Sequence, residues 1–261
     1  MTAAPPLLDP GNPAFQDFLR RGGPSLLASD YDGTIAPFRT RRDEALPPAS
    51  TRKLLKEILD SGGDIVILSG RRAGEVRTLL GLPVEIRGCH GWEILTSQGR
   101  DVSSPPPQGA KAAMASMRKA LAFLPRESLE MKPVSIAVHW RGNKKSETAF
   151  SARSGDVERI AAAHGLEALP FNGGMEYRFP FFSKGSALKE ILASGKKYGP
   201  VCFLGDDATD EDAFSAIIGK GLGILVSDAP RPSKASWRLQ PSSMNFFLSL
   251  WLGILRGGDT N

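Results

Sequence analysis

The stretch Gly205-Asp206-Asp207-Ala208-Thr209-Asp210-Glu211-Asp212 follows directly after the apolar run Val201–Leu204 and is strongly acidic. Carboxylates this close repel one another, by about 4 kcal/mol per pair at ~4 Å and an effective dielectric constant of ~20. A divalent cation such as Mg²⁺, which prefers oxygen ligands, would neutralise such a cluster. A helix N-terminus capped by Thr209 is the alternative, because acids are favourable in a first turn. That alternative explains the last three acids, but Asp206 and Asp207 precede the cap.

A second acidic pair lies far upstream, also after an apolar run. Ser25–Ser29 is predicted to be a short strand, and it leads into Asp30-Tyr31-Asp32-Gly33-Thr34. Carboxylates two residues apart on an extended segment point to the same side, and Gly33 permits a sharp turn with positive φ. Two acidic sites, each at the end of a predicted strand, favour the metal-site interpretation over a simple helix terminus.

Helical and strand patterns alternate along both ends of the chain. Ile65–Leu68, Val201–Leu204 and Leu222–Val226 are continuous apolar runs, as expected for strands buried on both faces. Helices are predicted from Asn12-Pro13 to about Arg21, across Leu54–Leu59 with Gly62-Gly63 as a stop, over about Arg72–Leu80, through Leu188–Leu192, and from Thr209. This alternation predicts an α/β fold with a parallel sheet and right-handed crossovers, which binds ligands at the carboxyl ends of its strands.

The middle of the chain has a different pattern. A proline-rich segment, Ser103–Gln108, opens it, and two runs alternate apolar and polar residues, Val134–Arg141 and Met175–Phe179. Helices over about Gly109–Leu124 and Gly155–His164 could cover the apolar face of such a sheet. We therefore predict an inserted smaller α/β cap domain at 107–182, within a core formed by 1–106 and 183–261. Simple solvation would explain a polar sheet face, but the position of the insertion favours a cap that closes over the site.

Composition narrows the class of protein. The chain has 261 residues, a formal net charge of +5 and a pI near 9.3, but its Lys and Arg residues are scattered, so we expect no nucleic-acid partner. Two cysteines imply no disulfide framework. The N-terminus lacks the pattern of a secretory signal. The apolar stretch Phe246–Leu255 is shorter than the ~20 residues of a membrane span and predicts a buried helix. We expect a cytoplasmic protein without a membrane partner, with a monomer as the working expectation.

The order of the polar motifs resembles that of a known superfamily. DxDGT at 30–34, SGR at 69–71, Lys184-Gly185 and GDDxTDED at 205–212 occur in the order seen in haloacid-dehalogenase phosphotransferases. The resemblance implies a Rossmann-like core with helices on both faces of a parallel sheet. Within that superfamily the chain resembles the trehalose-6-phosphate phosphatase family over nearly its whole length. The segments that carry this closer resemblance are Asp30–Thr34, Ser69–Arg71, Gly88–Glu93, Glu130–Lys132, Ser135–Arg141, Gly174–Pro180 and Gly205–Phe214.

The resemblance implies roles for the acidic residues. Asp30 would be the nucleophile that forms an aspartyl-phosphate, and Asp32 would protonate the leaving oxygen and then activate water. Mg²⁺ would be held by the Asp30 carboxylate, the Asp32 main-chain carbonyl and Asp206. Asp207 is a further candidate metal ligand, and Asp207 and Asp210 could instead lie just outside the ligand set. The cation would offset repulsion between an anionic nucleophile and an anionic phosphate.

The remaining core motifs are implied to bind the phosphoryl group. Ser69 would supply a hydroxyl, Lys184 a positive charge, and Gly33 and Thr34 backbone amides, with Gly70 in the same phosphate-binding set. Taken alone, Lys184 could be an ordinary lysine on a helix surface, and Ser69 could be a helix cap. Their places between the other motifs favour the phosphate-binding interpretation.

The middle segment is implied to recognise a disaccharide phosphate. Carboxylates suit sugar hydroxyls because they accept several hydrogen bonds in fixed geometry. The candidate substrate-binding residues are Arg71, Glu130, Lys132, Arg141 and Glu176, although a structural hydrogen-bonding role fits Arg71 equally well. Each of the others could be a surface charge. His90, His139 and Arg178 lie near these positions without an assigned role.

Three departures from the family pattern concern the choice of sugar more than the phosphatase chemistry. Trp140 stands where the family usually has Tyr, Ser29 precedes the nucleophile, and Trp92 replaces a small residue. The resemblance implies a Mg²⁺-dependent hydrolase that releases trehalose and phosphate from trehalose 6-phosphate. A phosphatase for sucrose 6-phosphate or mannosyl-3-phosphoglycerate is the first alternative, and an inactive binding or regulatory protein on the same fold is the second.

Overall fold

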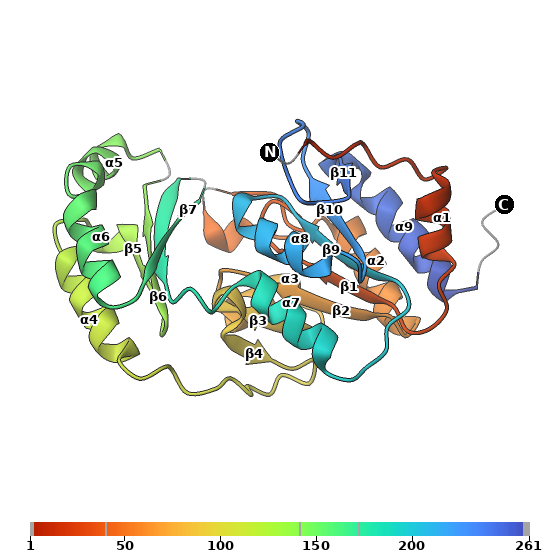
Figure 1. Cartoon of the computed structure of the whole chain (residues 1–261), viewed down its shortest axis with the longest axis horizontal. Helices are drawn as coiled ribbons and strands as arrows, with labels where there is room; N and C mark the ends of the chain where they lie inside the picture. The colour runs from red at the N-terminus through yellow and green to blue at the C-terminus, as the bar shows by residue number, and fades with distance from the viewer. Residues whose placement is uncertain (1–2, 40, 141, 172, 258–261) are drawn as a thin grey trace. The chain divides into compact units, whose positions relative to one another are not determined.

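A computed structural model describes residues 3–39, 41–140, 142–171 and 173–257 of the chain (Figure 1). The chain folds as two compact units. The core unit comprises Met1–Val102 and Ser183–Asn261, and the inserted unit comprises Ser103–Phe182. The function of the inserted unit as a cap remains a prediction.

The core unit is built on a seven-stranded sheet with the order β11-β10-β9-β1-β2-β3-β4. Its strands are β1 Leu26–Ser29, β2 Asp64–Leu68, β3 Glu85–Gly88, β4 Glu93–Leu95, β9 Val201–Gly205, β10 Leu222–Val226 and β11 Trp237–Leu239. Neighbouring strands are parallel except that the edge strand β4 runs antiparallel to β3. The predicted α/β class with a parallel sheet is confirmed, while the antiparallel edge was not predicted.

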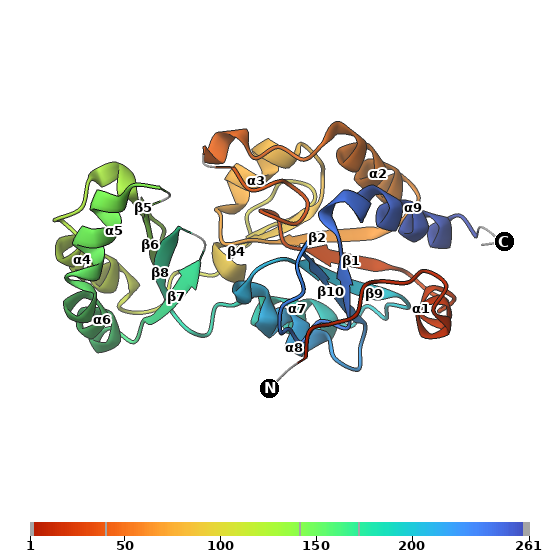
Figure 2. The ribbon, with the colours of Figure 1, turned by 90° about the horizontal axis from the view of Figure 1, so that it is seen from above.

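Both faces of this sheet are covered by helices, as the continuous apolar strands predicted. Leu27 of β1 packs in one core cluster with residues of α1, α2, α3 and α9, whereas Leu26 and Ala28 pack on the other face with α7 and α8. Figure 2 shows α2, α3 and α9 on one side of the sheet and α7 and α8 on the other. The helices of this unit are α1 Pro13–Leu19, α2 Ala49–Asp60, α3 Ala73–Leu80, α7 Lys184–Ala193, α8 Glu211–Ile217 and α9 Met244–Leu255.

The beginnings of two helices test the capping predictions. Asn12 caps α1 as predicted, and its side chain accepts a hydrogen bond from the amide of Ala14. The predicted cap at Thr209 was wrong. Thr209 lies inside the 3-10 helix η4 (Ala208–Asp210), and the N-cap of η4 is Asp207, whose carboxylate accepts from the amide of Ala208. Two successive acids can both serve as caps by residue type, and the local sequence did not distinguish them from Thr209.

The last helix, α9, is buried on one side only. Phe247, Leu248, Trp251 and Leu252 are buried, but Phe246 is 54% exposed, so the prediction that the whole stretch is buried was wrong at its first residue. An amphipathic helix that packs on one face of a sheet leaves such a residue in solvent. None of the helices formed by the described residues has the length and apolar character that crossing a bilayer demands.

The inserted unit is an antiparallel sheet with helices on one face. Its strands have the order β5-β6-β8-β7, and the pairs β5–β6, β6–β8 and β8–β7 are all antiparallel. Ile136, Val138 and Tyr177 are buried, as the predicted alternation requires, and the helices lie on one side of the sheet (Figures 1 and 2). The elements are α4 Ala110–Ala120, β5 Leu129–Met131, β6 Ser135–His139, α5 Lys144–Ser151, α6 Ser154–Ala163, β7 Glu167–Phe171 and β8 Gly174–Arg178. The sequence did not reveal α5, β5 and β7, because they are short or carry few apolar residues.

Candidate active site

The sheet register brings three predicted motifs to one edge of the core unit. β1 lies between β2 and β9, and its last residue, Ser29, pairs with Ile67 of β2 and Leu204 of β9. Asp30 follows β1 directly, and the other motifs begin one or two residues beyond the paired positions on their own strands. Because the strands are parallel, all three motifs lie at the carboxyl edge of the sheet, as predicted.

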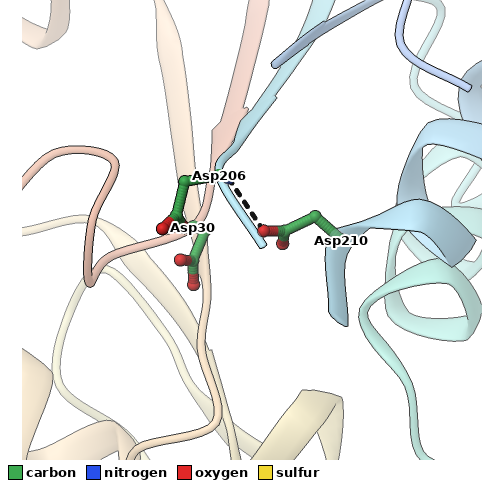
Figure 3. A group of neighbouring side chains, drawn as sticks. All are labelled: Asp30, Asp206 and Asp210. Atoms are coloured by element: carbon green, nitrogen blue, oxygen red, sulfur yellow. Dashed lines mark hydrogen bonds between the residues drawn. The ribbon is translucent and has the colours of Figure 1, made fainter. Parts of the chain in front are cut away.

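Three carboxylates meet at this edge. Among the described residues, Asp30, Asp206 and Asp210 each offer an oxygen atom within 4.8 Å of the others (Figure 3). Asp210 is fully buried, and its Oδ2 accepts hydrogen bonds of 3.0 Å from the main-chain amides of Asp206 and Asp207. The structure thus adds Asp210 to Asp30 and Asp206 in the acidic group, while the side chain of Asp207 caps η4.

Lys184 supplies positive charge to this group. It is the first residue of α7, whose N-terminus is set by a capping box between Ser183 and Ser186. The Lys184 ammonium group is buried and lies 2.7 Å from Asp30 Oδ1 and 2.7 Å from Asp210 Oδ1. A surface position for this lysine, the alternative considered from sequence, is therefore wrong.

Burial and crowding shift the pKa values of these groups. Burial, together with the nearby charges of Asp30 and Asp210, raises the pKa of Asp206 to about 9 against the opposing effect of Lys184. Burial likewise raises the pKa of Asp30 to about 7, against the opposing effect of Lys184. For Lys184, burial lowers the pKa, but the carboxylates of Asp210 and Asp30 outweigh burial and raise it overall. Burial and crowding thus disfavour the ionised forms of Asp30 and Asp206, although Lys184 lies among the acids.

The turn after Asp30 holds the carboxylate of Asp206. Gly33 adopts φ +79°, and a Cβ atom at this position would lie 2.0 Å from Asp206 Oδ2. Thr34 Oγ1 donates a hydrogen bond of 3.3 Å to Asp206 Oδ1. The predicted need for glycine at the turn is therefore both conformational and steric, because the Asp206 carboxylate occupies the space that a side chain would fill.

Asp32 is held by an arginine that is distant in sequence. Arg71 donates from Nε to Asp32 Oδ2 at 2.6 Å and from Nη2 to Asp32 Oδ1 at 2.7 Å, an arrangement that uses both carboxylate oxygens. The same guanidinium group donates to Glu75 and to the main-chain carbonyl of Arg42. Burial lowers the pKa of Arg71, but Asp32 and Glu75 raise it overall, so Arg71 is charged. We predicted Arg71 as a substrate-binding residue, and in the structure its partners are these carboxylates.

The Ser69–Arg71 loop packs against an unusual turn. Ser69 Oγ accepts a hydrogen bond of 3.1 Å from the amide of Arg71, and the amide of His90 donates to the Ser69 carbonyl at 2.9 Å. Cys89 and His90 have φ values of +48° and +59°, which are uncommon for residues other than glycine. A Cβ atom on Gly70 would lie 2.9 Å from His90 Cε1. A side chain at position 70 would therefore require the His90 ring to shift, a contact that no local sequence pattern predicted.

The inserted unit gathers polar side chains on the sheet face opposite its helices. Glu176 of β8 is buried, and its Oε1 accepts hydrogen bonds from Lys132 Nζ at 2.8 Å and from Ser135 Oγ at 2.6 Å. Lys132 also lies 3.8 Å from Glu130, whose Oε2 is 3.0 Å from His139 Nε2. Glu130, Lys132 and Glu176, three of the predicted substrate-binding residues, thus form one network.

Two arginines of that unit were also singled out from the sequence. Arg178 is buried, and its Nε donates to Glu167 of the neighbouring strand at 3.0 Å. Arg141, the fourth predicted substrate-binding residue of this unit, lies outside the described residues. Ser135 was not predicted as a site residue, although its position on the polar side of the alternating run could have indicated it.

The acidic group fits a hard divalent cation. All its side-chain ligand atoms are carboxylate oxygens, which Mg²⁺ prefers over softer ligands. The pKa values of Asp30 and Asp206 are raised by burial and by the neighbouring acids, and a bound cation would favour their ionised forms. Asp30 and Asp206 would hold the ion. Asp210 is engaged by Lys184 and by two amides, so we expect it to orient the ligands.

Comparisons with known proteins agree with this geometry. The family model for trehalose-phosphatase matches residues 28–243. A trehalose-phosphate phosphatase of Mycobacterium ulcerans is 28% identical over 227 residues, which cover 81% of this chain and 57% of that protein. The chain therefore spans little more than half the length of that relative.

Solved structures share the fold. The C-terminal domain of a Candida albicans trehalose-6-phosphate phosphatase has a TM-score of 0.77 at 20% identity and covers 99% of this chain and 100% of its own. A haloacid dehalogenase-like hydrolase from Bacillus subtilis has a TM-score of 0.58 at 15% identity, covering 88% of this chain and 98% of its own. With acidic motifs, Lys184 and the inserted sheet in place, and with the family model matching most of its length, the chain belongs to the trehalose-phosphatase family.

Proposed function

We propose that this protein is a Mg²⁺-dependent phosphatase that hydrolyses trehalose 6-phosphate to trehalose and phosphate through an aspartyl-phosphate on Asp30. The observation that carries the proposal is the buried group in which Lys184 Nζ lies 2.7 Å from Asp30 Oδ1, beside Asp206. A carboxylate nucleophile, a fixed positive charge and acidic ligands for a cation are together what transfer from a phosphate monoester requires.

In the first step, Asp30 attacks phosphorus. A bond forms between the Asp30 carboxylate and phosphorus, and the bond from phosphorus to the sugar oxygen breaks. The carboxylic acid form of Asp32 gives its proton to that oxygen and becomes a carboxylate, so the sugar leaves as a neutral alcohol. The paired hydrogen bonds from Arg71 support a role for that residue in orienting the Asp32 carboxylate.

In the second step, water attacks phosphorus and releases Asp30. Asp32 accepts a proton from the water, and phosphate leaves with the Asp30 carboxylate restored. Lys184 stabilises the charge on the phosphoryl oxygens in both steps, with Ser69 and the amide of Thr34 as further donors. The predicted donor at Gly33 is already engaged, because its amide donates a hydrogen bond of 2.7 Å to the Ala36 carbonyl. Bound Mg²⁺ would supply charge neutralisation between the nucleophile and the phosphate.

The sugar is proposed to bind the inserted unit. Glu130, Lys132 and Glu176 combine acceptors and a donor in one network, a composition suited to several sugar hydroxyls. Family membership supports trehalose as that sugar. Sucrose 6-phosphate and mannosyl-3-phosphoglycerate are the competing substrates that an assay must separate.

Phosphate release by the purified protein tests the proposal. We expect turnover of trehalose 6-phosphate in the presence of Mg²⁺, far weaker turnover of glucose 6-phosphate, sucrose 6-phosphate and an aryl phosphate, and loss of turnover with a chelator. Equal release from every substrate would keep the phosphatase chemistry and reject the disaccharide site. No release from any substrate would favour an inactive binding protein on this fold.

A further inference from the structure

Arg231 binds the main chain of Asp206 and Asp207, the two residues that form the acidic loop between β9 and η4. It lies in the segment between β10 and β11, and its Nη2 donates hydrogen bonds to the main-chain carbonyls of Asp206 at 3.2 Å and of Asp207 at 3.0 Å. These are the two residues that follow β9 and carry the chain from the sheet to η4. Arg231 is thus a cation placed on the peptide groups that bear a proposed metal ligand.

The guanidinium group is itself anchored. Arg231 Nη1 lies 2.7 Å from Glu211 Oε1, in the first turn of α8, and the other oxygen of Glu211 accepts from the amide of Lys234 at 2.8 Å. Glu211 therefore ties the segment around Arg231 to α8 through both carboxylate oxygens. These contacts account for Glu211, one of the acids at 205–212, as a structural residue and not as a ligand of a cation.

The acidic loop is held from two directions. The amides of Asp206 and Asp207 donate to Asp210 Oδ2, and the carbonyls of the same two residues accept from Arg231. Peptide groups tied on both sides have little freedom to rotate. The direction in which the Asp206 side chain leaves the backbone is fixed in the same way, and that side chain points into a group of acids that repel one another.

We propose that Arg231 is a positioning residue that holds Asp206 in the orientation needed to bind a divalent cation. This inference rests on the proposed function, because it takes Asp206 as a metal ligand. Without Arg231, the loop would keep only the amide hydrogen bonds to Asp210, and repulsion from Asp30 would turn the Asp206 carboxylate away. Forming the cation site would then require the loop to be ordered again. A purely structural arginine, in contrast, would affect stability and leave cation affinity unchanged.

Calorimetric titration of the substrate-free protein with Mg²⁺ tests the proposal directly. For Arg231→Met we expect affinity to fall by about 10-fold or more, the usual effect of removing a group that orients a metal ligand. Arg231→Lys keeps the charge but cannot span two carbonyls and Glu211, so its affinity should lie between those of Arg231→Met and the unmodified protein.

Arg77→Met is the matched control. The guanidinium group of Arg77 also binds main-chain carbonyls, those of Val84, Thr96 and Ser97, but it makes no contact with the acidic loop. We expect this variant to bind Mg²⁺ like the unmodified protein even where its melting temperature falls. Melting temperatures in a chelator show how much each substitution changes stability without the cation.

The outcomes separate the two proposals. If the unmodified protein binds Mg²⁺ and both Arg231 variants bind it with the same affinity, the role of Arg231 is overturned and the proposed function stands. If the unmodified protein does not bind Mg²⁺, the metal-dependent function fails and the role of Arg231 fails with it. Should Arg231→Met not fold, Arg231→Lys decides, because unchanged affinity in that variant contradicts the proposal.

Discussion

The acidic group of the core unit and the polar network of the inserted unit use the same kinds of side chain in opposite ways. In the core unit, Asp30, Asp206 and Asp210 turn oxygen atoms toward one another, and Lys184 is buried among them. In the inserted unit, the oxygens of Glu176 and Glu130 instead lie against donors or a histidine. In the first arrangement one lysine serves three neighbouring carboxylates. In the second, each of the two glutamates already has a hydrogen-bonding partner.

We infer from this difference that the core group carries the proposed chemistry and the inserted unit the proposed substrate recognition. Crowded buried carboxylates favour a cation and an electrophilic phosphoryl group, because either relieves their repulsion. Carboxylates held by a lysine or a serine present acceptors in fixed directions, which suits neutral hydroxyl groups. We therefore expect substitutions in the core group to stop turnover of every substrate, and substitutions in the inserted unit to change which substrate is used.

The largest effect should come from the nucleophile. Asp30→Asn keeps the shape of the side chain but removes the attacking carboxylate, and we expect kcat for any phosphate ester to fall on the order of 10⁴-fold or more. Phosphate release in the steady state measures it. Asp17→Asn, at an exposed position on α1, is the control and should retain activity. Appreciable turnover by Asp30→Asn would rule out the aspartyl-phosphate route.

Gly33 tests how far the core group depends on close packing. Gly33→Ala would place Cβ 2.0 Å from Asp206 Oδ2 at φ +79°, so the Asp206 carboxylate must move. We expect kcat/KM to fall about 10²-fold for all substrates, as for a misplacement of roughly 1 Å at a catalytic site.

Gly62→Ala is the matched control for that substitution. Gly62 has φ +83°, but no atom lies within 4 Å of the added Cβ. Backbone strain is thus similar in the two variants, but only Gly33→Ala also introduces a clash with the Asp206 carboxylate. Equal loss of activity in both would mean that strain, and not displacement of Asp206, explains the effect.

Substitution of Glu176 tests whether the inserted unit recognises the sugar of the substrate. Glu176→Ala removes the carboxylate shared by Lys132 and Ser135, and we expect kcat/KM for trehalose 6-phosphate to fall about 10- to 100-fold, as for loss of a charged hydrogen-bonding group. An aryl phosphate, which has no distal sugar, should be hydrolysed almost as before.

Glu167→Ala, on the neighbouring strand β7, controls for general damage to the inserted sheet. Glu167 pairs with Arg178 and its side chain is 40% exposed. We expect this variant to retain its preference for trehalose 6-phosphate. Should Glu176→Ala weaken both substrates alike, Glu176 would be a structural residue and the division between the two groups would fail.

The smallest effect should be on stability as a function of pH. In the metal-free protein the pKa of Asp206 is raised to about 9 and that of Asp30 to about 7, from an ordinary value of 3.8. The folded protein then binds protons that the unfolded chain has released, so this stabilisation is complete below the ordinary pKa and is lost as pH rises through the raised values. We expect the melting temperature in a chelator to fall between about pH 5 and about pH 9.

Two measurements sharpen that prediction. Mg²⁺ should raise the melting temperature more at the upper end of this pH range, where the carboxylates would be ionised, than at the lower end. Asp206→Asn should flatten the pH dependence in the chelator and remove most of the response to Mg²⁺. A melting temperature that rises steadily with pH in the chelator would contradict the raised pKa values.

Local patterns predicted most of the architecture. Continuous apolar runs indicated strands buried on both faces, and the alternating runs around Ile136 and Tyr177 indicated a sheet covered on one face. Short elements escaped prediction because a strand such as β4 or β5 spans too few residues to show a period. The cap was placed at Thr209 because Asp206, Asp207 and Thr209 can all cap a helix by residue type, and the turn that decides among them depends on contacts with Asp210.

By itself, the sequence indicated the candidate residues for the chemistry and their places at the ends of strands, because strand periodicity is a local property and the motifs resemble those of a known family. The tertiary structure decided which of them are partners. Asp210 and Lys184 are 26 residues apart, Arg71 and Asp32 are 39 apart, and Thr34 and Asp206 are 172 apart. Such pairs depend on strand order and register, which are set by packing over the whole sheet, and no local pattern records them.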